Sequence, residues 1–549
     1  MARESVKWGL LASISVAVVL AGAIPDAVFG QATSSWVHYD GKGKLQYATD
    51  ANGNRIIDYS SAGYEAGGVK LPLVAAKATV NPTGGDDTAA IQSAIDTVSA
   101  LPANKKGFRG AVLLAPGSFN VSATLNVTAS GVVIAGSGSG SNGSIITMTG
   151  SPFTLLNVSG SGSYTRAAAV SITDTYVPVG SSRFNVSDAS GLKAGDTVLI
   201  SRPVTAAWVA FMGMDKLVRD GQPQTWIAPG SEILTDRTIT HISGTRVTID
   251  APLTDSFDSQ LLNPPGGSIG TYTFPGRIIQ VGIEHLSIVA PAHEVSGTQY
   301  QAINLNNVQN AWLRDLNIHD TQNTIVLGSR TKQMTIDSVN VIHSYAQTNS
   351  AAPFDFSLSG TQVLVNRCSV TGQGNTWPFA PQSRLAGPIV VLNSTADDRG
   401  FDPHQRWATG LLCDLCNFPN SHTSDKSGVA YSNRGFFGSG HGWDAGWSVA
   451  WNATSTYFLI QAPPGTANWC IGCIGSVLSE AAPGGDGTIV PNGIYDSLGT
   501  AVTPGSLYLA QLKERLGSEA LHNIGYADVN GTAFSGCEIA PAGSSSREE

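Results

Sequence analysis

The chain has 549 residues and a formal net charge of −9, and 13% of its residues are charged. A negative net charge argues against a nucleic-acid partner, and this length is too great for one ordinary compact core, so the chain either divides into domains or elongates. Such a chain would repel an acidic polymer unless a local basic cluster received it.

Residues 1–30 have the composition of a secretory signal peptide. Arg3 and Lys7 precede an apolar run that reaches Ile24, and small residues follow as far as Gly30. The apolar run is shorter than the roughly 20 residues that a membrane-spanning helix needs. We therefore expect cleavage rather than a membrane anchor, a secreted and extracellular protein, and no membrane attachment of the mature chain.

Asn-x-Ser/Thr sequons support secretion, because eight of them together are typical of a eukaryotic secreted glycoprotein, although a bacterial chain could carry them unused. The sequons begin at Asn120, Asn126, Asn142, Asn157, Asn185, Asn393, Asn452 and Asn530.

The first strong helix signal is "GGDDTAAIQSAIDTVSAL", which predicts a helix that begins near Asp87 or Thr88. Ile91, Ile95 and Val98 fall on one face of this helix at a spacing of 3.6 residues. The segments "GAVLLAPGSFNV", "ATLNV" and "GVVIAGSG" follow and are typical of short strands separated by turns.

This order of segments resembles the opening of proteins of the pectate lyase superfamily. The resemblance covers roughly residues 70–160 and 275–480. It implies a right-handed parallel β-helix whose N-terminal end is covered by a helix. It says little about the substrate, because that superfamily includes lyases, hydrolases, epimerases and phage tailspikes.

Residues 164–258 predict a compact β insertion, because "RFNVSDASGLKAGDTVLISRP" and "RTITHISGTRVTIDAPL" are typical of hairpins. Trp208, Met212, Met214 and Trp226 lie between the hairpins. We interpret them as the core of the insertion, and the alternative is one wall of a sugar-binding cleft.

A short pattern of apolar residues recurs in the second half of the chain. It appears as "IEHLSI" from Ile283, "LRDLNI" from Leu313, "IDSVNV" from Ile336 and "VNRCSV" from Val365, with looser copies as "LCDLCN" and "WCIGCI". The first four copies begin 23 to 30 residues apart, a period typical of one coil of a stacked solenoid. The longer gaps before the looser copies indicate an insertion or more than one coil, and the alternative fold is a β-sandwich with irregular loops.

The predicted fold is all-β: a right-handed parallel β-helix with an N-terminal capping helix, a small β insertion and a C-terminal packing helix. "SLYLAQLKERLG" predicts that last helix, with Leu509, Leu512 and Leu516 on one stripe. The expected division is a signal peptide (1–30), an N-terminal extension (31–70), the start of the β-helix with its capping helix (71–163), the insertion (164–258), the main β-helix with long loops (259–500), the C-terminal helix and final strand (501–540) and a disordered tail (541–549).

The chain contains two C-x-x-C motifs, Cys413 with Cys416 and Cys470 with Cys473. The second motif follows the first by 57 residues at both cysteines. In an oxidising compartment such cysteines favour disulfides over zinc. If the two segments occupy adjacent coils, equivalent residues stand about 4.8 Å apart, within disulfide range. We therefore predict Cys413–Cys470 and Cys416–Cys473 bonds, and Cys368 as a buried free thiol.

The stretch "DDRGFDPHQRWATG", residues 397–410, concentrates charge in a chain that carries about half of the usual 25% of charged residues. Stacked coils could bring it together with more distant cationic and aromatic side chains in one lateral groove. The predicted catalytic residues are His404, Arg406, Arg399 and His441, and the predicted substrate-binding residues are Trp407, Trp443, Trp377, Arg367, Arg384 and Asp402.

These residue types suit β-elimination on a uronic-acid polymer. Arginine forks bind the substrate carboxylate, and histidines carry out the proton transfers. His404 and Arg406 are two residues apart, so on a strand they would face the same way. We expect Arg406 or Arg399 to hold the carboxylate, His404 to act as base or acid, and His441 to be the second proton-transfer group.

The alternative enzyme is a glycoside hydrolase, which needs two carboxyl groups. Asp397 and Asp398, followed by "GHG" at residues 440–442, partly resemble polygalacturonase-type hydrolases, but the spacing is longer and the Arg-Ile-Lys motif of that family is absent. A second alternative is a glycan-binding solenoid without catalysis. We expect a monomer with an acidic polysaccharide substrate, no metal site and no firm cofactor, with calcium-assisted elimination left open.

Overall fold

The computed structural model describes residues 32–292, 299–345, 353–372, 376–419 and 428–534. The predicted signal peptide and the predicted disordered tail lie outside these ranges. Within the described ranges, no helix is long and apolar enough to cross a membrane.

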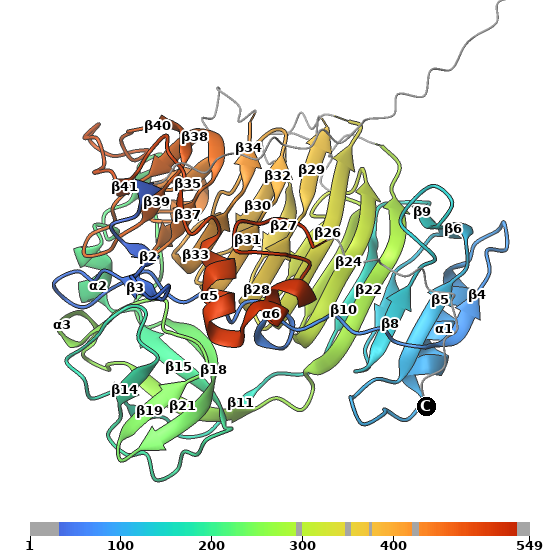
Figure 1. The fold of residues 1–549 in the computed structure, drawn as a ribbon, viewed down its shortest axis with the longest axis horizontal. Coiled ribbons are helices and arrows are strands. Elements are labelled where there is room, and N and C mark those ends of the chain that lie inside the picture. Colours follow the sequence, from blue (N-terminus) through green and yellow to red (C-terminus); the bar gives the residue numbers. More distant parts are fainter. Residues whose placement is uncertain (1–31, 293–298, 346–352, 373–375, 420–427, 535–549) are drawn as a thin grey trace, which may run out of the picture.

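The chain folds as the predicted right-handed parallel β-helix, a stack of coils that runs across the width of Figure 1. One long parallel sheet faces the viewer, and its central strands pair over most of their length. Its strands include β22 (Ile278–Val289), β24 (Val308–His319), β26 (Lys332–His343), β28 (Thr361–Asn366), β31 (Ala386–Leu392), β33 (Ala408–Asp414), β37 (Val449–Trp451) and β39 (Trp469–Ile471).

The predicted repeat is confirmed by the strand register. Ile283 pairs with Leu313, Leu313 with Ile336, and Ile336 with Val365. All four side chains point into the core and are at most 1% exposed. Each copy of the pattern therefore marks one coil.

The two longer gaps each contain one further coil that the sequence pattern did not reveal. Val391 stacks between Val365 and Cys413, and Ala450 stacks between Cys413 and Cys470. The interior residues of these coils include Ser394 and other small side chains, so the apolar pattern is interrupted there.

A second parallel sheet forms another face of the solenoid. It contains β7 (Leu125–Val127), β10 (Thr154–Ser159), β23 (Gln301–Asn306), β25 (Ile325–Leu327), β27 (Phe354–Leu358) and β30 (Trp377–Pro381). Isolated bridges from Phe379 to Phe401 and from Phe401 to Val429 carry this face into the next coils.

Helix α1 (Thr88–Ser99) covers the N-terminal end of the stack, as predicted (Figure 1). Ile91, Ile95 and Val98 are at most 1% exposed and belong to the main core. The carboxylate of Asp87 accepts hydrogen bonds from the backbone and hydroxyl of Thr83, which fixes the turn before the helix.

The insertion is an antiparallel sheet below the solenoid in Figure 1. It contains β14 (Arg183–Asn185), β15 (Thr197–Pro203), β18 (Glu232–Ser243), β19 (Arg246–Ile249) and β21 (Ser268–Thr273). Because β21 pairs with β15, the insertion runs past residue 258. Trp208, Met212, Met214 and Trp226 are buried in its core, which favours our first interpretation of them over a cleft wall.

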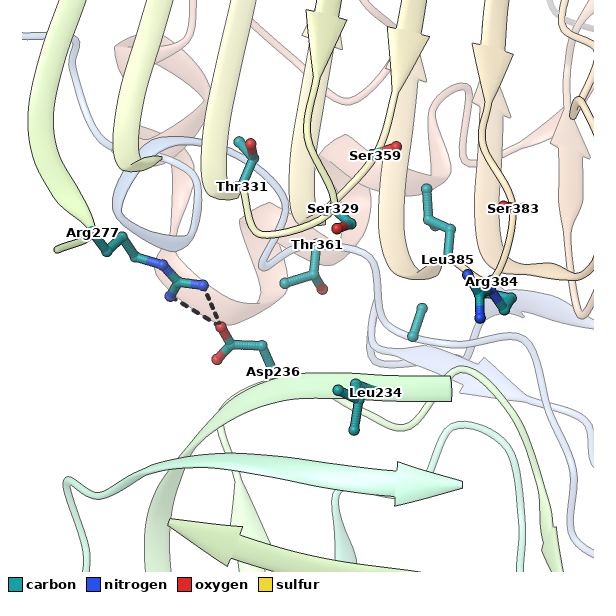
Figure 2. A pocket seen from close by; sticks show the side chains of 12 residues that line it. Leu234, Asp236, Arg277, Ser329, Thr331, Ser359, Thr361, Ser383, Arg384 and Leu385 are labelled. Atoms are coloured by element: carbon teal, nitrogen blue, oxygen red, sulfur yellow. Dashed lines mark hydrogen bonds and ion pairs between the residues drawn. The ribbon is translucent and has the colours of Figure 1, made fainter. Parts of the chain in front are cut away.

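Strand β18 fastens the insertion to the solenoid through two successive residues. Asp236 forms ion pairs with Arg277 at 3.0 Å, drawn in Figure 2, and with Lys332 at 2.9 Å. Arg237 is fully buried and donates to carbonyl oxygens that include Gly387 O at 2.7 Å and to the hydroxyl of Thr361 at 2.9 Å. These contacts hold the two parts close together. A small cavity of about 50 Å³ lies beside them (Figure 2).

Helix α5 (Leu507–Leu516) packs on the outer side of the long sheet, in front of it in Figure 1, and α6 (Ser518–Asn523) follows. Leu509 and Leu512 are fully buried, as predicted, whereas Leu516 is 47% exposed. Leu516 lies at the last position of the helix, beyond the area that the solenoid covers.

Candidate functional site

The candidate site lies on the outer surface of the second sheet, in the coil that follows β30. Phe401 points into the core and is fully buried. The backbone of Asp402 donates to Phe379 O and that of His404 to Pro381 O, so the parallel register continues past Phe401. Because side chains alternate along an extended strand, Asp402 and His404 point outward.

Two histidines meet at this surface. The rings of His404 and His441 are 5.0 Å apart between centroids and nearly perpendicular. His441 follows the short helix α4 (Phe437–Gly440). The Nδ1 of His404 lies 3.1 Å from Oε1 of Gln382, and the ring of Phe354 lies 4.9 Å from the same imidazole. An amide oxygen accepts, so Nδ1 carries the hydrogen and Nε2 keeps its lone pair.

Both imidazoles are held in the neutral form. Burial lowers the pKa of His404 to about 4, and the positive charges of Arg434 and Arg406 add to that effect. Burial, again followed by Arg434, lowers the pKa of His441 to about 3. At neutral pH both side chains are therefore uncharged and able to accept a proton.

Two guanidinium groups lie over one indole ring beside the histidines. Arg399 lies 4.2 Å from the ring centroid of Trp377, and Arg434 lies 5.4 Å from it. Arg434 also donates to the carbonyl oxygen of His404 at 2.9 Å and lies 3.7 Å from the carboxylate of Asp402. Arg399 is 8% exposed and Trp377 is half-buried, so the arrangement is a largely buried cluster of cationic and aromatic side chains on a chain whose net charge is negative.

A buried polar cluster lies behind this surface. Asp355 is fully buried and accepts hydrogen bonds from Thr324 at 3.1 Å and from Thr376. His343 Nε2 lies 2.9 Å from the same carboxylate. Burial is the largest single effect and opposes protonation of His343, but the charge and hydrogen bond of Asp355 together with the charges of Asp320 and Asp398 raise its pKa. The carbonyl oxygen of Thr376 accepts from Arg399 at 3.4 Å, which links the cluster to the surface.

Arg406 does not face the same way as His404, contrary to our expectation. Its backbone has a positive φ of 53°, which turns the side chain away from the strand direction. Its guanidinium donates to Trp226 O at 2.6 Å and to Ser439 O at 2.8 Å. Arg406 therefore connects the solenoid to the insertion, and it reaches His404 only through its charge.

Trp407 and Trp443 are not available to a substrate, and this part of the prediction is wrong. They are 1% and 4% exposed, and both belong to the core of the insertion. The indole of Trp407 donates to Asp255 at 2.7 Å, and that of Trp443 donates to Met212 O at 3.1 Å. The insertion buries them because it packs over this coil.

Arg367 and Arg384 lie away from the histidine pair, so the prediction that they bind substrate at this site is also wrong. Nη2 of Arg367 donates to both carboxylate oxygens of Asp337 at 2.8 Å, on the long sheet beside α6. Arg384 is exposed at the cavity between the insertion and the solenoid, where Figure 2 shows its side chain.

Asp397 and Asp398 occupy the turn before Arg399. His441 contacts the opposite end of this segment, where the backbone of Arg406 donates to His441 O. Oδ2 of Asp397 lies 3.4 Å from the backbone nitrogen of Gly372, which donates to it. Asp398 contributes to the raised pKa of His343 through its charge. The structure thus places this acid pair nearer to the buried cluster than to the histidine pair.

The predicted Cys413–Cys470 and Cys416–Cys473 bonds are contradicted by the strand register, and the structure draws all four cysteines as buried thiols. Their segments are not on adjacent coils: the strand that carries Ala450 lies between Cys413 and Cys470 and pairs with both. Cys368 is a buried free thiol, as predicted.

Within the described ranges, no group of three or more histidine, cysteine, aspartate or glutamate side chains could hold a metal ion. The carboxylates near the histidines are instead engaged with arginine, histidine or hydroxyl partners. The calcium-assisted alternative therefore gains no ligand set from these residues.

Sequence reasoning missed Gln382 and Phe354 as neighbours of His404. Both come from earlier coils, 22 and 50 residues before the histidine. Neither has a motif of its own, and only the stacking register brings them to the site. Arg434 was not among the predicted site residues either, and its contact with Trp377 could not be derived from spacing.

No protein-family model and no curated protein matches this chain. Among solved structures it is similar to the tailspike protein of E. coli bacteriophage HK620, with 11% identity over 86% of this chain and 68% of that one and a TM-score of 0.37. It is also similar to the A-module of the Azotobacter vinelandii mannuronan C-5 epimerase AlgE6 (12%, 76% and 96%, TM-score 0.28) and to the endo-xylogalacturonan hydrolase of Aspergillus tubingensis (13%, 77% and 92%, TM-score 0.28). Because these similarities are low, the fold is assigned from the strand pairing of this chain.

Proposed function

We propose that this chain is a secreted polysaccharide lyase that cleaves a uronic-acid polymer by β-elimination. The observation that carries the proposal is the pairing of two neutral imidazoles, 5.0 Å apart, with two guanidinium groups around a partly exposed indole. A uronate lyase needs a cationic group for the substrate carboxylate and a neutral base for the neighbouring proton, and this cluster contains both.

The substrate carboxylate would be received by Arg399 and Arg434. Guanidinium groups bind carboxylates through charge-assisted hydrogen bonds, and the low exposure of this surface strengthens such bonds relative to water. Trp377 would hold the two guanidinium groups in place through the contacts with its ring. Because the guanidinium groups neutralise the carboxylate, the proton on the adjacent carbon becomes more acidic. The same cations stabilise the resulting carbanion.

His404 is the proposed base. Its Nδ1 is engaged with Gln382, so its Nε2 is the nitrogen that can accept the proton α to the carboxylate. The C–H electron pair then forms the carbon–carbon double bond as the bond to the glycosidic oxygen in the β position breaks. That oxygen takes up a proton, and the imidazolium of His404 is the source within reach.

His441 would position the ring of His404. Its ring packs nearly perpendicular to that of His404, and its own pKa of about 3 keeps it uncharged when the substrate binds. Because the pKa of His441 is lower than that of His404, the abstracted proton stays on His404 until the glycosidic oxygen takes it.

A glycoside hydrolase is the second candidate, favoured by the position of Asp402. This carboxylate points outward in the same coil as His404. Hydrolysis also requires a second carboxyl group across the scissile bond, and Asp397 and Asp398 lie at the other end of the strand. We therefore rank elimination first.

The test is the product formed from a panel of uronic-acid polymers by the full-length protein. A lyase produces an unsaturated sugar that absorbs in the ultraviolet, a hydrolase produces reducing ends without that absorbance, and a binding protein produces neither. We expect His404→Ala to reduce kcat by about 100- to 10,000-fold. The matched control is His241→Ala, an exposed histidine of the insertion, which should retain activity. Reducing ends without ultraviolet absorbance would replace elimination by hydrolysis.

A further inference from the structure

Four cysteine thiols gather inside the last coils of the solenoid. Cys413, Cys416, Cys470 and Cys473 are at most 1% exposed and belong to the main core. They form two C-x-x-C turns with the same backbone geometry, because the third residue of each has a left-handed conformation. Its φ is 54° at Leu415 and 67° at Gly472.

Bonds between the two turns are excluded by the register. Ala450 pairs with both Cys413 and Cys470, so these cysteines lie two strands apart. Cys416 and Cys473 are separated in the same way, with Ala453 between them, because Thr454 donates to Cys416 O and Ile474 donates to Ala453 O. Two strand spacings amount to about 9.5 Å, which exceeds the Cα separation of about 7 Å that a disulfide tolerates.

Within each turn the two thiols are neighbours. The bend at the left-handed residue turns both side chains into the core, where Cys413 contacts Cys416 and Cys470 contacts Cys473 through their sulfur atoms. The second sulfur of each turn lies 3.6 Å from the carbonyl oxygen two residues before it, Asp414 O in one turn and Ile471 O in the other. The same arrangement thus occurs twice in the molecule.

We propose that each C-x-x-C turn closes on itself, giving the disulfides Cys413–Cys416 and Cys470–Cys473. Each bond forms by thiol–disulfide exchange with a small-molecule disulfide such as oxidised glutathione. The first thiolate attacks that disulfide and releases one small thiol, and the second thiolate then attacks the mixed disulfide and releases the other. The two cysteines lose two protons and two electrons in total, and the small-molecule disulfide gains them.

Burial sets the order of events. Native thiols that are at most 1% exposed cannot meet a dissolved oxidant, so we infer that the bonds form before the last coils stack. Each bond would then hold its turn in shape inside the core cluster that also contains Tyr431. The turns of the coils nearest to the candidate site would thereby be covalently fixed.

Cys368 provides an internal control. Thr395 donates to Cys368 O, Asn417 donates to Ser394 O and Thr454 donates to Cys416 O, so Cys368 occupies the coil position of Cys416 two coils earlier. Three residues before it stands Val365 rather than a cysteine. A thiol at this position without a partner in its own turn should stay free.

The experiment is peptide mapping of the full-length protein, secreted from an oxidising compartment and purified without reductant. The protein is denatured in iodoacetamide, digested with trypsin without reduction and analysed by mass spectrometry. Cleavage after Lys426 separates the two turns. We expect each turn in a peptide that is unalkylated and two hydrogen masses lighter than the dithiol, with Cys368 alkylated.

Three outcomes would overturn the proposal. They are alkylation of all four cysteines, a disulfide-linked pair of peptides that joins Cys413 or Cys416 to Cys470 or Cys473, and stoichiometric zinc bound to four alkylatable thiols. In Cys413→Ser we expect Cys416 to become alkylated while the second turn keeps its bond. If that variant fails to fold, the map of the wild-type protein still decides the question.

Discussion

The charge state of His404 decides which proton-transfer role this residue can take. An ordinary histidine is half-protonated near pH 6.5, whereas burial and the neighbouring arginines lower the pKa of His404 to about 4. A base must be deprotonated when the substrate arrives, so the lowered pKa extends its working range to acidic pH. Gln382 selects Nε2 as the reactive nitrogen.

The pH dependence of kcat/KM follows from this pKa. We expect a plateau at neutral and mildly acidic pH and a fall below about pH 4, where His404 becomes protonated. The profile is measured with a uronate polymer from pH 3 to 8 at constant ionic strength. A fall that is already complete at pH 6 would show that an ordinary histidine, and not His404 in this environment, limits the reaction.

Substitution of Arg434 should move that acid limb. Arg434→Met removes a positive charge that disfavours the imidazolium of His404, so the pKa of His404 should rise and the limb should shift to higher pH. Comparing both enzymes on the same polymer cancels the titration of the substrate. Arg384→Met is the matched control, because Arg384 is exposed and is not among the charges that shift His404. If the acid limb does not move, the charge of Arg434 does not lower the pKa of His404.

The tryptophans show how far single residues can be interpreted from sequence. Trp377, Trp407 and Trp443 all lie near charged residues, and all three were predicted to bind substrate. Only Trp377 is placed beside the arginines at the surface. The other two are covered by an insertion that lies about 200 residues earlier in the chain, and no local pattern reports such a distant covering.

At the scale of elements, the register follows directly from the apolar pattern where the interior residues are large. Ile283, Leu313, Ile336 and Val365 were aligned by sequence and are aligned in space. The pattern fails where Ala450 takes the interior position, because an alanine is common at exposed positions as well. That one missed coil also explains the wrong disulfide prediction.

The junction between the insertion and the solenoid depends on the buried ion pairs of Asp236. We expect Lys332→Met to lower the free energy of unfolding by about 3–5 kcal/mol, because it leaves the carboxylate of Asp236 buried with one cation fewer. Guanidinium chloride denaturation measures the change, and Lys105→Met, at an exposed position, is the control. A loss below about 1 kcal/mol, the size typical of a surface ion pair, would contradict this role.

The whole molecule carries a net charge of −9, whereas the candidate site is locally cationic. An acidic polymer therefore meets long-range repulsion and short-range attraction. The opposing effects have different ranges, because salt screens exposed charges over a Debye length of about 30 Å at 0.01 M and about 10 Å at 0.1 M, and screens partly buried groups less.

Ionic strength should consequently affect binding in an unusual direction. We expect the KM for a uronate polymer to fall between about 0.01 M and 0.1 M salt, because the repulsion is screened before the contacts with Arg399 and Arg434 are weakened. Initial rates at neutral pH over this range measure the effect, with an uncharged glucan of similar length as the control polymer for viscosity. A steady rise of KM over the same range would indicate that surface attraction brings the substrate in.

The central claim is that a neutral imidazole and two guanidinium groups on the outer surface of the solenoid perform an elimination. The most direct measurement is the ultraviolet absorbance released from uronic-acid polymers by the wild-type protein and by His404→Ala. We expect an unsaturated product with the wild type and a loss of at least about 100-fold with the variant. Equal rates for the two proteins, or reducing ends that appear without ultraviolet absorbance, would contradict it.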